Sequence, residues 1–112
     1  MTPVAPNPEL VIGVSPLGVP DPRPVAAVRR AGGLGVLDLG TGDRRAREAL
    51  ASAHRWTSGA FGVRVGPSCA LTPEEVAEEC GGALPPVVLL APGADWKIAQ
   101  LGAPTRVLAE AG

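Results

Sequence analysis

The chain has 112 residues, a formal net charge of −1, and 15 glycines and 13 prolines, which together make a quarter of the sequence. Hydrophobic residues make up 46% and charged residues 19% of the chain, a balance typical of a folded domain rather than a disordered one. The balanced charge gives no electrostatic footprint for nucleic acid. No apolar stretch approaches the roughly 18 residues of a membrane span. We therefore expect one domain with one modest core.

Two features bear on the expected location of the protein. Residues 1–9 are rich in proline and lack the basic region and apolar core of a secretory signal. Cys69 and Cys80 are eleven residues apart, which is neither a metal-ligand spacing nor a CxxC spacing. We expect two reduced, buried or half-buried thiols in a cytoplasmic protein, with 1–9 as an N-terminal segment and 10–112 as the domain.

Short apolar runs alternate with helical patterns along the chain. The runs, which we interpret as strands, are residues 10–14, 34–39, 61–65, 87–91 and 106–109. The segments between them that we expect to be helical are 24–31, 43–54, 73–80 and 95–101. The first strands begin about 24–27 residues apart, and strands that are apolar on both faces favour a parallel βα sheet.

Helix-end residues support this alternation. Pro24 suits the first turn of a helix, and either Thr41 or Asp43 can cap the next one. Thr72 and Glu75 have the spacing of a capping box. The glycines at the ends of these segments predict where the helices stop.

Two architectures fit a parallel βα repeat: part of a closed (βα)₈ barrel, or an open, doubly wound, flavodoxin-like sheet of five strands. The length favours the open sheet. However, the loop 15–20 has a single glycine instead of GxGxxG, and neither a P-loop nor the acidic strand ends of a receiver domain are present.

Three segments favour the barrel through a resemblance. They are VSPLG at 14–18, AGGLG at 31–35 and FGVRV at 61–65. In this order and spacing they resemble the N-terminal part of the nitronate monooxygenase (2-nitropropane dioxygenase-like) family of FMN-dependent TIM barrels. That family includes flavin-dependent enoyl reductases, and this chain is most similar to versions within bacterial modular polyketide synthases.

The resemblance implies a set of cofactor-binding residues. In the family the turn matching Ser15, Pro16, Leu17 and Gly18 lies against the flavin; the alternative is a turn that only reverses the chain. Arg64 stands where the family usually has an asparagine that helps hold the flavin. An arginine there either places a fixed cation near the flavin pyrimidine or marks a remodelled site without flavin. The plainer alternative is that it pairs with Glu110 or another carboxylate at the strand ends.

Other polar and aromatic residues receive structural interpretations. Asp38 interrupts an apolar strand, so we expect it to face the mouth of the sheet or to pair with an arginine. The run 40–42 (GTG) either lets a ligand approach the backbone or simply forms a cap and loop. Trp56 and Trp96 are expected to be packing residues, and His54 is expected at the surface without a catalytic role.

A complete (βα)₈ barrel needs about 250 residues and commonly holds its cofactor phosphate on the loops after strands seven and eight. The sequence therefore predicts the N-terminal half of such a barrel, part of an FMN-dependent oxidoreductase domain that is not active alone and has no assignable catalytic residue. The expected partners are the remainder of the barrel or a self-associating copy, and other polyketide synthase domains. We expect no metal, nucleic acid or membrane. The alternative is a non-catalytic module that docks on another domain or chain.

Overall fold

The computed structural model describes residues 12–14, 19–96 and 106–109. Its elements alternate between strand and helix up to the last two strands. They are β1 (Ile12–Val14), α1 (Pro22–Arg30), β2 (Leu34–Asp38), α2 (Arg44–Thr57), β3 (Gly62–Val65), α3 (Pro73–Glu79), β4 (Val87–Leu90) and β5 (Arg106–Ala109). The predicted mixed α/β fold is confirmed. The helix expected at 95–101 lies, apart from its first two residues, outside the described residues.

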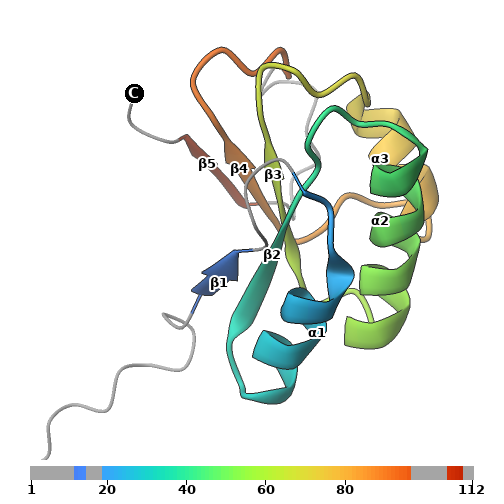
Figure 1. Ribbon diagram of the computed structural model, residues 1–112, viewed down its shortest axis with the longest axis vertical. Coiled ribbons are helices and arrows are strands. Elements are labelled where there is room, and N and C mark those ends of the chain that lie inside the picture. Colours follow the sequence, from blue (N-terminus) through green and yellow to red (C-terminus); the bar gives the residue numbers. More distant parts are fainter. Residues whose placement is uncertain (1–11, 15–18, 97–105, 110–112) are drawn as a thin grey trace, which may run out of the picture.

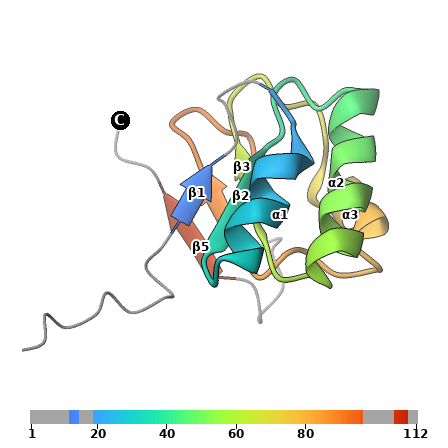
Figure 2. The ribbon, with the colours of Figure 1, turned by 60° about the horizontal axis from the view of Figure 1, so that its bottom comes forward.

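The strands form one parallel sheet whose spatial order, β1-β2-β3-β4-β5, is the order of the chain. The three helices lie together on one face of this sheet (Figures 1 and 2). The molecule is therefore a two-layer arrangement of sheet and helices in the part of the chain that the structure describes.

The core fills the space between these two layers. From the sheet come residues that share its helix-facing side: Leu37, Val63, Val65, Val88 and Leu90. The helices supply a second set that is equally buried: Val25, Ala46, Ala49, Leu50, Ala53 and Val76. Such side chains alternate along each strand with those of the opposite face, as the pleat requires.

Gly35 brings β2 and α1 close together. A Cβ atom at this position would lie 2.5 Å from the carbonyl oxygen of Val25 and 2.6 Å from its Cα. Only glycine therefore allows the helix backbone to approach the strand this closely. The glycine that the sequence showed within the segment 31–35 thus has a packing role in addition to the nearby helix stop.

The ends of α1 and α2 are fixed by local capping. Asp21 caps α1 by accepting a hydrogen bond from the Arg23 amide, so this helix begins at Pro22, two residues earlier than predicted. Asp43 caps α2 by accepting one from the Ala46 amide, which confirms one of the two predicted caps. At the other end, α2 runs to Thr57 and stops at Ser58, which adopts a left-handed conformation (φ 54°).

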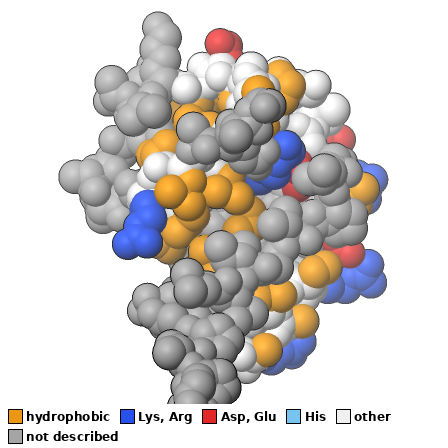
Figure 3. Space-filling view, turned by 90° about the vertical axis from the view of Figure 1, so that its left-hand side faces the viewer, with side chains coloured by type: hydrophobic (Ala, Val, Ile, Leu, Met, Phe, Trp, Pro, Cys, Tyr) orange, Lys and Arg blue, Asp and Glu red, His pale blue; other side chains and the backbone are white. Residues whose placement is uncertain are grey.

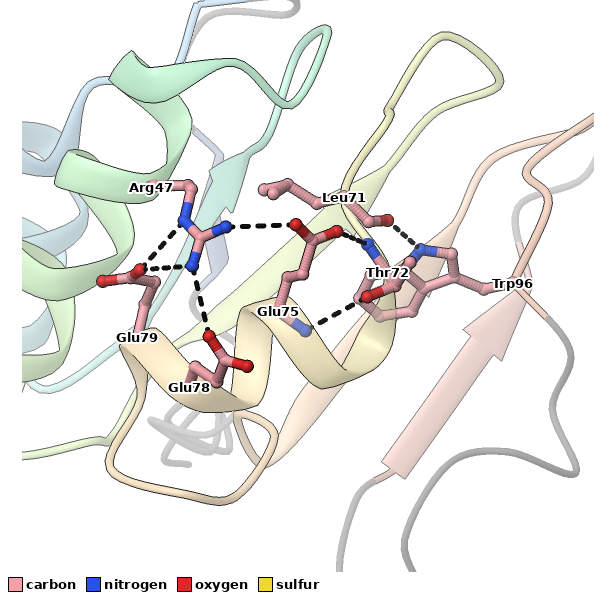
Figure 4. A network of polar contacts seen from close by, with 7 residues as sticks. All are labelled: Arg47, Leu71, Thr72, Glu75, Glu78, Glu79 and Trp96. Atoms are coloured by element: carbon pink, nitrogen blue, oxygen red, sulfur yellow. Dashed lines mark hydrogen bonds and ion pairs between the residues drawn. The ribbon is translucent and has the colours of Figure 1, made fainter.

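Polar contacts join α3 to its neighbours (Figure 4). The predicted capping box is present: the Glu75 amide donates to the Thr72 hydroxyl, and the Thr72 amide donates to the Glu75 carboxylate. Arg47 of α2 forms ion pairs at 2.9–3.3 Å with three glutamates of α3, namely Glu75, Glu78 and Glu79. The indole of Trp96 donates to the Leu71 carbonyl oxygen at 2.8 Å, so the chain after β4 is tied to the start of this helix.

Candidate functional site

Asp38 and Arg64 lie side by side near the carboxyl ends of β2 and β3, because the parallel register pairs these two positions. Arg64 Nη1 donates to Asp38 Oδ2 at 2.9 Å, and the Gly40 amide donates to Asp38 Oδ1 at 2.8 Å. The Asp38 side chain is 2% exposed and the Arg64 side chain 20%. The expectation that Asp38 pairs with an arginine is thus confirmed. Among the described residues the carboxylate that pairs with Arg64 is Asp38, while Glu110 lies outside them.

This ion pair forms the carboxyl-edge end of a largely apolar sheet face. Leu37 and Val63 face the helices, so their neighbours Asp38 and Arg64 point to the opposite face of the sheet. Arg106 shares that face at the amino end of β5. The other described side chains of the face are hydrophobic: Leu34, Val36, Val87, Leu89 and Leu108. The pair is therefore the charged feature nearest to the carboxyl edge on this face of the described sheet.

A hollow of about 230 Å³ opens beside the ion pair. Two loops complete its lining: Gly40 and Thr41 follow β2, while the segment 66–68 follows β3. Gly66 lies beside the guanidinium, since a Cβ there would be 3.8 Å from Arg64 Nη1, an ordinary contact distance. Ligands of parallel α/β proteins bind at this carboxyl edge. The hollow is smaller than the roughly 300–1,000 Å³ of a complete small-molecule pocket, so it represents one part of such a site.

Of the cofactor-binding residues predicted from the sequence, the structure places only Arg64. Ser15, Pro16, Leu17 and Gly18 lie outside the described residues. Among the described residues, Arg64 lies together with Asp38.

The two glycines of the loop 40–42 have different roles: one is consistent with a close approach of ligand to backbone, and the other with a purely structural loop. Gly40 lines the hollow, in keeping with a close approach of ligand to backbone. Gly42 (φ 73°) instead packs inward, because a Cβ there would lie 2.8 Å from the amides of Ala70 and Leu71. The segment 66–68 was missed as site lining, although a glycine directly after a buried strand could have indicated it.

The two cysteines differ in their burial. Burial raises the pKa of the Cys80 thiol to about 12, and it also raises that of the half-buried Cys69. Both cysteines are free, as expected.

The two tryptophans also differ in their burial. Trp96 is 7% exposed and belongs to the core, whereas Trp56 is 50% exposed, so the prediction that Trp56 is a packing residue is wrong.

Comparisons with protein-family models, curated proteins and solved structures found no match to this chain. Within residues 12–14, 19–96 and 106–109, no three His, Cys, Asp or Glu side chains gather as metal ligands. In the same ranges no helix is long and apolar enough to cross a membrane.

Proposed function

We propose that the chain is the N-terminal portion of an FMN-dependent oxidoreductase domain of the nitronate monooxygenase and enoyl reductase type, within a cytoplasmic polyketide synthase. The observation that carries the proposal is the Asp38–Arg64 pair beside a hollow at the carboxyl edge of a parallel sheet. This is the edge at which βα barrels bind their ligands. The sequence segments at 14–18, 31–35 and 61–65 supply the particular family.

The proposed architecture is the N-terminal half of a (βα)₈ barrel. Two features support it: the strands lie in chain order, and the three described helices cover one face of the sheet. A barrel has both properties, since each βα unit adds one strand beside the last and one helix to the outer ring. A flavodoxin-like sheet has the order 2-1-3-4-5 with helices on both faces.

The donors around the hollow suit a polar ring with carbonyl acceptors, such as the flavin pyrimidine. Arg64 offers a guanidinium cation, and the lining glycines let a planar group approach the backbone closely. Bound FMN would supply the hydride-transfer chemistry. The residues that we expect to hold it are Ser15, Pro16, Leu17 and Gly18 together with Arg64, and the hollow takes only a part of the group.

The role that we assign to Asp38 is to position Arg64. Its buried carboxylate receives the Arg64 guanidinium on one oxygen and the Gly40 amide on the other, which fixes the cation at the edge of the sheet. A cation held in this way favours a ligand whose charge becomes negative, as a reduced flavin ring does. No residue of the chain is assigned a step in bond making, so activity of the isolated chain is not expected.

Titration of FMN, followed by quenching of its fluorescence, tests the proposal. It is run on the 112-residue chain and on the longest natural polypeptide that contains it. We expect FMN to bind. We also expect the substitution Arg64→Gln, made in an Asp38→Asn background, to weaken this binding about tenfold, the effect of one charge-assisted hydrogen bond. The matched control is Arg106→Gln, which removes a charge at the opposite, amino end of β5. Failure of the longest polypeptide to bind FMN, or equal loss in both variants, would overturn the assignment.

A second candidate function is a non-catalytic module that associates with a second copy of this chain. It is favoured by the hydrophobic sheet face that no described helix covers, which Figure 3 shows from the side of the sheet. Leu108 is 43% exposed there. In addition, β1 and β5 each pair with a single neighbour among the described strands, which leaves edges that another strand can extend. A chain that stays monomeric in solution would exclude this second function.

A further inference from the structure

A groove on the outer surface of the helical layer lies apart from the carboxyl-edge hollow. It has a volume of about 390 Å³ and is lined by Arg23, Ala26 and Arg30 of α1 and by Trp56 in the last turn of α2. None of these residues lines the hollow at the sheet edge. The groove therefore needs an explanation of its own.

Trp56 is the most exposed large hydrophobic side chain of the described residues. Half of its surface meets solvent, although a tryptophan is normally well buried in a folded protein. Tryptophan and arginine are also the residue types that contribute most often to the energetic centre of protein interfaces. Their combination in one groove indicates a surface that a partner covers.

The charge around the groove restricts the chemistry of that partner. Helices α1 and α2 carry seven arginines, Arg23, Arg29, Arg30, Arg44, Arg45, Arg47 and Arg55, against a single acidic residue, Glu48. The other acidic residues of the chain lie outside these two helices, and four of them are the glutamates of α3. The net charge of −1 thus conceals a basic helical surface, for which an acidic partner is complementary.

The two arginines of the groove differ in how they are held. Arg23 Nε and Nη2 bond the carboxylate of Asp21 at 2.8–3.3 Å, which orients its side chain while leaving it 82% exposed. Arg30 forms no ion pair with another described residue. One cation is therefore already oriented, and the other can accept a carboxylate from outside.

We propose that this groove binds an acidic peptide segment with two apolar residues between two carboxylates. Arg23 and Arg30 are seven residues apart on α1, which corresponds to about 10 Å along the helix. A peptide in the polyproline II conformation has three residues per turn and rises about 3.1 Å per residue, so its side chains at i and i+3 lie on one face, about 9 Å apart. Acidic side chains at positions i and i+3 would thus reach the two arginines, and the apolar residues between them would lie over Ala26 and against Trp56.

The two tryptophans make the test specific, because each gives its own indole signal in a ¹H–¹⁵N NMR spectrum. Trp56 lines the groove, while the Trp96 indole is buried and bonded to the Leu71 carbonyl, so it serves as an internal reference. Trp56→Phe assigns the two signals. The probe is acetyl-Gly-Asp-Leu-Ile-Glu-Gly-amide, added to the whole 112-residue chain. We expect a saturable shift of the Trp56 signal below about 1 mM peptide, weakened by salt, with the Trp96 signal unchanged.

Charge variants distinguish the groove from basic charge in general. Arg30→Glu should weaken peptide binding at least about tenfold, and Trp56→Ala at least about fivefold. Arg44→Glu is the matched control: it makes the same change of charge at the exposed start of α2, outside the groove, and should alter binding less than twofold. Circular dichroism checks that each variant is folded.

Several results would overturn the proposal. The amide analogue of the peptide, with Asn and Gln in place of Asp and Glu, should not bind, and equal binding would show that charge complementarity is not the cause. Equal losses of peptide affinity in the Arg30→Glu and Arg44→Glu variants would show that the peptide is attracted by positive charge in general and not by a site in the groove. A single-stranded oligonucleotide that shifts the Trp56 signal more tightly than the peptide would assign the groove to nucleic acid instead.

Discussion

The Asp38–Arg64 pair couples the stability of the sheet to the candidate site. Asp38 is 2% exposed, and its two oxygens accept hydrogen bonds from Arg64 and Gly40. A buried carboxylate that loses its cation keeps the cost of its desolvation without the compensating attraction. The residue proposed to face the ligand is therefore also one on which the fold depends.

Arg64→Met is expected to lower the free energy of unfolding by about 3 kcal/mol, because it leaves Asp38 buried without this partner. Combining it with Asp38→Asn should restore much of the loss, since the pair is then replaced by neutral side chains. Urea denaturation of the two single variants and the double variant measures the coupling. Additive effects of the two substitutions would contradict the interpretation that the pair acts as a unit.

At the scale of one element, α3 is held by its capping box and by Arg47. The Thr72 amide lowers the pKa of Glu75, with smaller contributions from the Thr72 hydroxyl and from Arg47. A carboxyl group whose pKa is lower in the folded state stabilises the protein above its unfolded pKa, near 4.5. That contribution is lost as the pH falls through the lower, folded pKa.

Glu75→Gln should therefore lower stability at pH 7 and reduce the loss of stability between pH 5 and pH 3. The measurement is the urea midpoint at each pH. Glu74→Gln is the control, because Glu74 is an exposed residue of the same first turn that makes none of the contacts in the network. Thr72→Ala removes the cap itself and should cost about 1 kcal/mol. A pH profile of the Glu75 variant that matches the natural chain would contradict the role given to this carboxylate.

Local sequence signals predicted most elements, because helix caps and glycine or proline residues mark the ends of the strands and helices. The capping box at Thr72 was predictable from its spacing, whereas Asp43 was one of two residues expected to cap α2. The boundaries that moved depend on particular contacts: Asp21 starts α1 earlier, and Thr57 extends α2 by donating to the Ala53 carbonyl oxygen at 2.7 Å.

Non-local contacts set the limit of prediction for the site. The sequence suggested that Asp38 pairs with an arginine and that Arg64 pairs with a carboxylate. The register of β2 with β3 was needed to show that they pair with each other. Trp56 and Trp96 could not be told apart by their composition or neighbours. Trp56 is exposed on α2, whereas Trp96 is buried and its indole donates to the Leu71 carbonyl oxygen. This difference arises only from packing.

At the scale of the whole molecule, the sheet is covered by described helices on one face only (Figure 1). The other face presents Leu34, Val87 and Leu89 as half-buried side chains and Leu108 as an exposed one. A half barrel would cover this face with further strands, and the alternative module would cover it with a second copy. Both proposals therefore require that the face be hidden in the functional assembly.

Leu108→Glu is expected to weaken self-association of the 112-residue chain, because it places a charge on the hydrophobic face without entering the core between sheet and helices. Light scattering with sedimentation over a range of concentrations measures the dissociation constant, which should rise at least about tenfold, the equivalent of 1.4 kcal/mol. Ala83→Glu adds the same charge in the exposed loop between α3 and β4 and should leave the constant unchanged. A chain that stays monomeric at every concentration would exclude the self-associating module. The half-barrel proposal would stand in that case, because the cover it requires comes from strands beyond those described.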